Sequence, residues 1–96
     1  MRPVLISDLR AVMRVLVAAI PEDRARLCRR IVREAELADR YTRRLGRVHP
    51  QWGNGTLMAA AARFPMGPEL SWNRPAGLAS LRCLTEALAA ERDDDV

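Results

Sequence analysis

The segment from Gly46 to Gly55, GRVHPQWGNG, brings together side chains that are suited to binding. It supplies a guanidinium, an imidazole, a large flat indole and an amide, and two further arginines come just before it. Such a set suits an anionic group, a nucleotide base or the acidic side chain of a partner protein. The candidate interaction site therefore consists of Arg43, Arg44, Arg47, His49, Trp52 and Asn54.

The same segment also has the composition of a rigid corner between two helices. Its three glycines permit positive φ, and Pro50 restrains His49 to an extended conformation. Asn54 can cap the next helix while its side chain bonds to the turn, and Trp52 would close the open end of a helical bundle. The composition favours this structural role and leaves a binding site as the alternative.

Catalytic chemistry has little support in the sequence. His49 is the only histidine, and the chain contains neither a P-loop nor a Gly-x-Gly-x-x-Gly motif. Glu34, Glu36 and Asp39 alternate with arginines on a predicted helix, which is typical of a solvated face rather than of an acid–base pair. We therefore predict no catalytic residue and no enzymatic activity.

The two cysteines, Cys28 and Cys83, lack the Cys-x-x-Cys spacing of zinc sites, and one histidine cannot complete a usual ligand set. We expect no metal and no cofactor, and we expect both cysteines to be buried free thiols in a reducing compartment. Arg14 interrupts the apolar stretch after Asp8, so the sequence predicts neither a signal peptide nor a membrane span. The expected location is the bacterial cytoplasm.

Around the corner segment, apolar spacing predicts an all-α fold, one small bundle-like domain of about four helices over residues 1–90. The first helix starts at the N-cap Ser7-Asp8 and carries a buried stripe as far as Ile20, and the second runs from Pro21 to about Leu45. The buried stripe of the long second helix ends with Tyr41 and Leu45, and Gly46 stops it in a left-handed conformation.

A short third helix, capped by Asn54 or Thr56 and ended by Pro65, is almost entirely apolar, so we expect it to be buried. A last helix starts near Asn73 or Pro75, with a leucine stripe at 78, 81, 84 and 88. Its end frays from Glu91 because three aspartates oppose the helix dipole there. Residues 91–96 are therefore predicted to form a disordered acidic tail.

All 16 basic residues are arginines, which is typical of a GC-rich genome as well as of guanidinium chemistry. Residues 1–90 hold fifteen arginines and eight acidic residues, a net charge of +7, whereas residues 91–95 carry −3. The arginine-rich second helix has a candidate basic face for phosphates, made of Arg29, Arg30, Arg33 and Arg40. Two features argue against sequence-specific DNA recognition. The corner segment is longer than the turn of a helix-turn-helix motif, and the next helix, Leu-Met-Ala-Ala-Ala-Ala, has no side chain that could recognise a base.

Residues 43–61, RRLGRVHPQWGNGTLMAAA, resemble a segment shared by short, uncharacterised helical proteins of alphaproteobacteria that hold a domain of unknown function. In that group a similar Arg-Leu-Gly-Arg-x-His-Pro-x-Trp-Gly-Asn-Gly-[Ser/Thr]-Leu-Met segment joins two helices. The resemblance implies a helical fold over most of the chain and carries no activity, cofactor or catalytic residue with it.

These observations favour a small cytoplasmic protein that acts as a protein–protein interaction adaptor or regulator. The alternative is a nucleic-acid-binding protein that contacts phosphates through its arginine-rich second helix. The partner is expected to be another protein, the chain can be a monomer or a homodimer, and no membrane association is expected.

Overall fold

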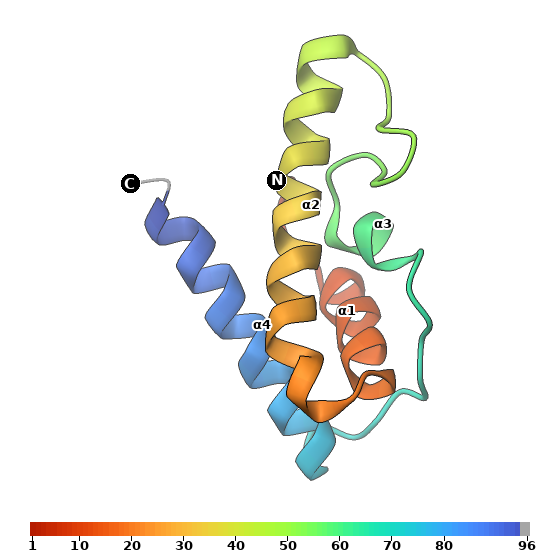
Figure 1. Ribbon diagram of the computed structural model, residues 1–96, viewed down its shortest axis with the longest axis vertical. Coiled ribbons are helices and arrows are strands. Elements are labelled where there is room, and N and C mark those ends of the chain that lie inside the picture. Colours follow the sequence, from red (N-terminus) through yellow and green to blue (C-terminus); the bar gives the residue numbers. More distant parts are fainter. Residues whose placement is uncertain (95–96) are drawn as a thin grey trace.

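The computed structural model describes residues 1–94 and confirms the all-α prediction (Figure 1). The elements are α1 (Ile6–Ala18), a 3₁₀ turn η1 (Pro21–Asp23), α2 (Arg24–Leu45), α3 (Leu57–Ala61) and α4 (Pro75–Asp94). The described residues form no strand, and their one isolated bridge joins His49 to Gly53. None of the helices in this part of the chain combines the length and the apolarity needed to cross a membrane.

Helix α1 begins and ends earlier than its sequence pattern predicts. Its N-cap is Leu5, and Asp8 lies at the third helical position, where its Oδ2 accepts a hydrogen bond from the Leu5 N–H at 2.9 Å. The helix stops at Ala18, and Ile20, predicted to be in the buried stripe, is 63% exposed. The extended backbone before Pro21 accounts for the early end, because proline disfavours a helical conformation in the residue that precedes it.

Helix α2 is the long helix that the sequence predicts, but Pro21–Asp23 form a separate 3₁₀ turn before it. Gly46 ends the helix as predicted, with φ of 70° and its N–H bonded to the Thr42 carbonyl at 2.8 Å. The prediction that Leu45 is buried is wrong, since it is 50% exposed. After Gly46 the chain folds back along α2 and leaves the last turn of the helix uncovered (Figure 1).

The core lies where α1, α2 and α4 meet, with the five-residue α3 packed onto α1 and α2. Its largest fully buried side chains include Leu16, Ile31, Leu57 and Leu84, one from each α-helix. Alanines at helix contacts, such as Ala35 and Ala60, let the backbones approach closely. The prediction that α3 is buried is confirmed for Leu57, Ala60 and Ala61, whereas Met58 faces outward at 40% exposure.

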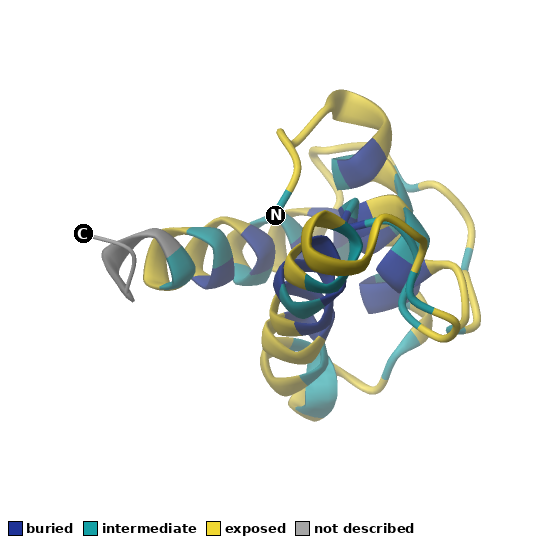
Figure 2. Ribbon diagram, turned by 90° about the horizontal axis from the view of Figure 1, so that it is seen from above, coloured by how far each residue is buried: buried dark blue, intermediate teal, exposed yellow. Residues whose placement is uncertain are grey.

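Helix α4 crosses α2 near its own start and then diverges from it, so that its later turns extend away from the other helices (Figure 2). The sequence predicts fraying from Glu91, and in the structure the helix continues to Asp94. Unfavourable charge at an exposed helix end costs about 1 kcal/mol or less, which is too little to stop the helix at Glu91. The prediction of a disordered tail also includes residues 95–96, which lie outside the described residues.

Candidate functional site

The loop between α2 and α3 is held by hydrogen bonds of its own. His49 and Gly53 exchange two backbone bonds at 2.9 and 3.2 Å, which closes a tight turn around Pro50. Inside this turn, Nδ1 of His49 accepts hydrogen bonds from the N–H groups of Gln51 and Trp52 at 3.1 and 3.0 Å. Nδ1 of the imidazole is therefore occupied within the loop, and Nε2 is the ring nitrogen left to donate a hydrogen bond.

Three aromatic rings add rigidity to the loop. The His49 ring stacks on Trp52, with centroids 4.5 Å apart and an interplanar angle of 7°. Tyr41 of α2 packs against His49 in a T-shaped arrangement, with centroids 4.8 Å apart and an interplanar angle of 71°. The stack attaches the tip of the loop to the side of α2, so Trp52 braces the loop rather than closing an open end of the bundle.

Asn54 and Thr56 together start α3. Asn54 Oδ1 accepts hydrogen bonds from the Thr56 N–H at 3.1 Å and from the Thr56 hydroxyl at 2.9 Å. Thr56 is the N-cap, and its Oγ1 accepts a hydrogen bond from the Ala59 N–H at 3.1 Å. Of the two predicted caps, Thr56 is thus the cap itself, and Asn54 holds Thr56 in place.

Gly55 brings this loop into direct contact with α2. Its φ is +100°, and a Cβ built on it would lie 2.6 Å from the Asp39 Cβ and 2.7 Å from the Asp39 Cα. Its carbonyl also accepts a hydrogen bond from the Arg2 N–H at 3.1 Å. Only glycine permits both this backbone conformation and this distance.

Asp8 links the starts of two helices. While Oδ2 bonds to Leu5, Oδ1 accepts a hydrogen bond from the Met58 N–H in the first turn of α3 at 3.0 Å. The carboxylate is 4% exposed and lies at the positive end of both helix dipoles. Asp8 is not among the site residues predicted from the sequence. Its position three residues after Leu5 is compatible with the hydrogen bond at the start of α1, but no local sequence pattern indicates the contact with α3.

The prediction that Glu34, Glu36 and Asp39 form a solvated face is wrong. All three residues are buried, with 8%, 5% and 6% exposure. The amino group of Met1 bonds to Glu36 and lies 3.4 Å from Asp39, so the N-terminal segment covers this side of α2. The same ammonium lowers the pKa of the Glu36 carboxyl against the opposing effect of burial.

Arginines complete the pairing of these carboxylates. Arg30, Arg40 and Arg43 contact Glu34, Glu36 and Asp39 at 3.3, 3.3 and 2.8 Å, each pair being spaced i, i+4 along α2. Arg63, which follows α3, also bonds to Glu34. Phe64 lies beneath the guanidinium groups of Arg63 and Arg30, whose Cζ atoms are 4.7 and 5.3 Å from the ring centroid.

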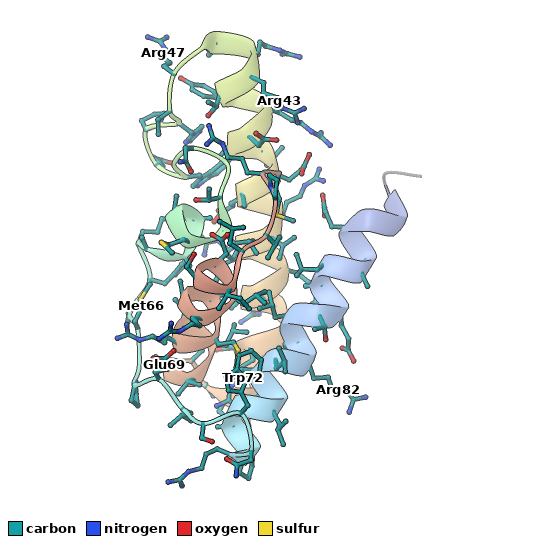
Figure 3. The ribbon with its side chains drawn as sticks, turned by 180° about the vertical axis from the view of Figure 1, so that it is seen from behind. Arg43, Arg47, Met66, Glu69, Trp72 and Arg82 are labelled. Atoms are coloured by element: carbon teal, nitrogen blue, oxygen red, sulfur yellow. The ribbon has the colours of Figure 1, made fainter. Side chains whose placement is uncertain are left out.

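The structure divides the predicted interaction site into two parts. His49, Trp52 and Asn54 lie together in the loop, and Arg43 is paired with Asp39. Arg44 and Arg47 are exposed and form no ion pair with any residue that the structure describes. Figure 3 shows Arg43 and Arg47 at the far end of α2, pointing away from the body.

Two aliphatic side chains lie beside these arginines in the sequence. Leu45 is 50% exposed and Val48 is 57% exposed. We call Arg44, Leu45, Arg47 and Val48 the α2 tip. The apolar half of the tip is not evident from the sequence, because apolar spacing alone places Leu45 in the buried stripe.

The predicted basic face is exposed as a set, since Arg29, Arg30, Arg33 and Arg40 all lie on the solvent side of α2. Three of the four are engaged: Arg30 and Arg40 in the pairs above, and Arg33 with Glu91 of α4 at 3.7 Å. Arg29 has no ion pair with any described residue. The face is therefore basic but partly neutralised.

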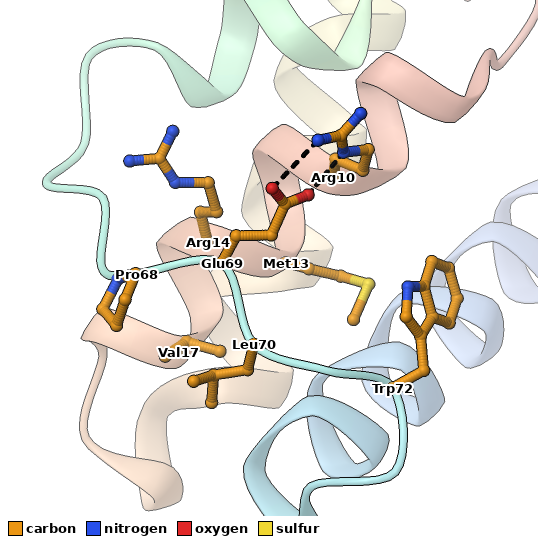
Figure 4. A pocket seen from close by; sticks show the side chains of 8 residues that line it. All are labelled: Arg10, Met13, Arg14, Val17, Pro68, Glu69, Leu70 and Trp72. Carbon is orange, nitrogen blue, oxygen red and sulfur yellow. Dashed lines mark hydrogen bonds and ion pairs between the residues drawn. The ribbon is translucent and has the colours of Figure 1, made fainter.

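A small hollow beside α1 is lined by Met13, Val17, Leu70 and Trp72, with Arg10 and Glu69 at its edge (Figure 4). Arg10 forms two hydrogen bonds to Glu69, which raises the pKa of the guanidinium and lowers that of the carboxyl. The Gly67 N–H donates a hydrogen bond to the Arg14 carbonyl of α1 at 2.9 Å, and Nε of Arg14 donates one to the Gly67 carbonyl at 2.9 Å. The hollow is mainly apolar, and Arg10 and Glu69 at its edge neutralise each other, which suits packing of the 65–74 segment on α1.

The cysteines are free thiols, with Cys28 buried and Cys83 half-buried. Burial raises the pKa of the Cys28 thiol to about 12, so it carries no thiolate at neutral pH. Within the described residues, no three His, Cys, Asp or Glu side chains are grouped so that they could hold a metal ion.

Residues 2–90 match the family model described as a domain of unknown function (DUF7742), and the chain therefore belongs to that family. No curated protein and no solved structure shows significant similarity to the chain.

Proposed function

We propose that this member of the DUF7742 family is a small non-enzymatic adaptor or regulator that binds another protein through the α2 tip. The observation that carries the proposal is the exposure of Leu45 and Val48 next to Arg44 and Arg47, two arginines that form no ion pair with any described residue. Arginine and apolar side chains at the centre of a patch are typical of protein interfaces.

The tip is held rigidly, which favours binding. Gly46 fixes the turn after α2, and the stack of Tyr41, His49 and Trp52 fastens the following loop to the same helix. A surface that is ordered before binding loses less conformational entropy when the partner arrives. In this proposal the loop residues of the predicted site position the tip and do not themselves contact the partner.

The mixture of side chains favours a protein partner over nucleic acid. Phosphates would be bound by the arginines alone, whereas an acidic and apolar protein surface would also cover Leu45 and Val48. Both cysteines are free, which supports the reducing cytoplasm as the compartment of this interaction.

Comparative affinity capture from native cells tests this proposal. The immobilised chain is compared with Leu45→Ser/Val48→Ser and Arg44→Ala/Arg47→Ala. Arg82→Ala serves as the control, because Arg82 is also exposed but lies on α4. We expect the wild type and the control to capture the same partner. Both tip variants should capture at least about tenfold less of that partner. Equal capture of the partner by all four proteins would refute the proposal that the α2 tip is the binding surface.

Trp52→Ala separates the structural role of the loop from a binding role. We expect it to lower the free energy of unfolding by about 2 to 4 kcal/mol, because the stack on His49 is lost and a cavity is left. Urea denaturation followed by circular dichroism measures this change. A variant that keeps wild-type stability and still loses the partner would instead place Trp52 in the interface.

The second candidate function is contact with nucleic-acid phosphates along the exposed arginines of α2. The observation in its favour is the spacing of Arg26, Arg29, Arg33, Arg40 and Arg44, which extend along the solvent side for about 27 Å at 1.5 Å per residue. Fluorescence anisotropy with labelled duplex and single-stranded DNA tests it at low and moderate salt. Binding that weakens steeply with salt would support this function, and no binding at low salt would eliminate it.

A further inference from the structure

His49 holds the turn that follows α2 through a single acceptor atom. Its Nδ1 accepts hydrogen bonds from the N–H groups of both Gln51 and Trp52, at 3.1 and 3.0 Å. The backbone of His49 also exchanges two hydrogen bonds with Gly53, at 2.9 and 3.2 Å. An imidazole accepts at Nδ1 only while that nitrogen carries no hydrogen, so the turn requires the neutral ring with its hydrogen on Nε2.

A protonated ring does not fit this turn. An imidazolium has a hydrogen on both nitrogens and no acceptor, so its Nδ1–H would point at the two N–H groups that Nδ1 now binds. Turning the ring over does not restore the bonds, because the carbon Cδ2 then takes the place of Nδ1. The N–H groups of Gln51 and Trp52 therefore lose their acceptor when the ring gains a proton.

The α2 side of the ring supplies no free negative charge. Tyr41 packs against the imidazole in a T-shaped arrangement, and its phenol carries no charge in acid. Arg44 comes one turn after Tyr41 on the helix, and its positive charge disfavours an imidazolium. The nearest carboxylate of α2 in the sequence belongs to Asp39, which is paired with Arg43 at 2.8 Å. Within the described part of the chain, no carboxylate forms an ion pair with His49.

The loop side of the ring is formed by Trp52, which stacks on it with centroids 4.5 Å apart. Arg47 is the charged residue of the loop closest to His49 in the sequence, and it adds a second positive charge. An indole face attracts a cation, but only while the ring stays stacked, where its Nδ1 meets the two N–H groups. That single attraction is opposed by the loss of two hydrogen bonds, so the protonated ring leaves the stack.

We propose that the loop between α2 and α3 is a pH-sensitive device, in which protonation of His49 releases the turn that His49 and Gly53 close. The neutral ring holds the turn, and acid frees the imidazolium, the Trp52 indole and the two N–H groups to solvent. Val48 immediately precedes His49, so this release also displaces one apolar side chain of the α2 tip. The release itself is a property of the chain alone, and only its effect on partner binding rests on the proposed function.

NMR spectroscopy of the full chain between pH 7.5 and pH 5 tests this device, because histidine is the residue type that changes charge in that range. His49 is the only histidine in the sequence, so its Hε1 signal reports the protonation of one known ring. Hydrogen exchange of the Gln51 and Trp52 amides, corrected for the intrinsic effect of pH, reports the two hydrogen bonds. We expect their protection to fall about fivefold as the ring gains its proton, which is the contribution of one net hydrogen bond. The Gly46 amide, bonded to the Thr42 carbonyl, is the internal reference and should keep its protection.

Two substitutions separate the acceptor from its titration. His49→Asn places Oδ1 at the position of Nδ1 and keeps an acceptor that does not titrate, in a role that asparagine commonly takes in turns. We expect the Gln51 and Trp52 amides of this variant to keep the same protection throughout the pH range. His49→Gln carries its amide one carbon further along the side chain and lacks an acceptor at that position, so the same amides should have low protection at every pH. Thermal melts by circular dichroism verify that both variants are folded.

Four results would overturn the proposal. Three concern the wild type: an imidazole that stays neutral at pH 5, a proton gained without loss of protection at Gln51 and Trp52, or an equal loss of protection at Gly46, which would indicate general unfolding. The fourth is the same pH dependence in His49→Asn, because a different group would then be responsible.

Capture of a partner at pH 7.5 and pH 5.5 tests the link between the turn and the α2 tip. We expect the wild type to capture less partner at the lower pH, and His49→Asn to capture equal amounts at both. Equal capture by the wild type at both pH values would refute this link. The absence of any partner would count against the proposed function alone, because the NMR measurement of the turn needs no partner.

Discussion

Gly55→Ala tests the contact between the corner loop and α2 most sharply. The new Cβ would lie 2.6 Å from the Asp39 Cβ and 2.7 Å from the Asp39 Cα, so either the loop or α2 must move. A positive φ costs an alanine about 1 to 2 kcal/mol, and forcing a methyl group into a packed contact costs about 1 to 3 kcal/mol more. The expected loss is therefore about 2 to 5 kcal/mol, a large part of the stability of a small domain.

Gly46→Ala is the matched control for this prediction. Gly46 also has positive φ, at +70°, but a Cβ there would meet nothing within 4 Å. Its cost is the conformational one alone, about 1 to 2 kcal/mol. Urea denaturation of both variants measures the difference, and equal destabilisation by the two substitutions would refute the close approach of the loop to Asp39.

Three further predictions concern buried polar groups. Asp8→Ala should lower the free energy of unfolding by about 2 to 3 kcal/mol in urea denaturation, because the N–H groups of Leu5 and Met58 lose their acceptor; a loss below about 0.5 kcal/mol would contradict the link between α1 and α3. The pKa of Glu36 is lower in the folded chain than its ordinary value of 4.5, so its contribution to stability is present above pH 4.5 and is lost as the pH falls further. Urea midpoints of the wild type and Glu36→Gln should therefore converge between pH 6 and pH 3, and a constant gap would argue against the ion pair with the Met1 amine. Cys28, whose pKa is raised to about 12, should resist a maleimide at pH 8 in the folded chain and react in urea, as read by peptide mass spectrometry; rapid labelling of the folded protein would show that the thiol is not buried.

The helical fold could be predicted because its signals are local. Apolar spacing marks α2 and α4, and Gly46 marks the end of α2 by its tolerance of positive φ. The i, i+4 ion pairs of α2 follow from the sequence for the same reason. Apolar spacing cannot show that α2 extends beyond the elements packed against it. For this reason it predicts burial for Leu45, which is exposed in the structure.

The burial of Glu36 and Asp39 could not be predicted from α2 alone. Their partners and neighbours include the Met1 amine and Gly55, which lie far away in the sequence. In the sequence of α2 alone, these two acidic residues have the same spacing from arginines as solvent-exposed acidic residues have. The structural role of the corner was predictable from its glycines and Asn54, whereas the acceptor role of His49 Nδ1 depends on the turn that His49 itself closes with Gly53.

Comparative capture with the Leu45→Ser/Val48→Ser variant tests most directly whether the chain is an adaptor that binds through the α2 tip. Both side chains are exposed, so the variant should keep its stability within about 0.5 kcal/mol. We predict that the wild type and Arg82→Ala retain a common protein partner that this folded variant loses. Retention of the same partner by the variant, or the absence of any partner of the wild type, would contradict the proposal.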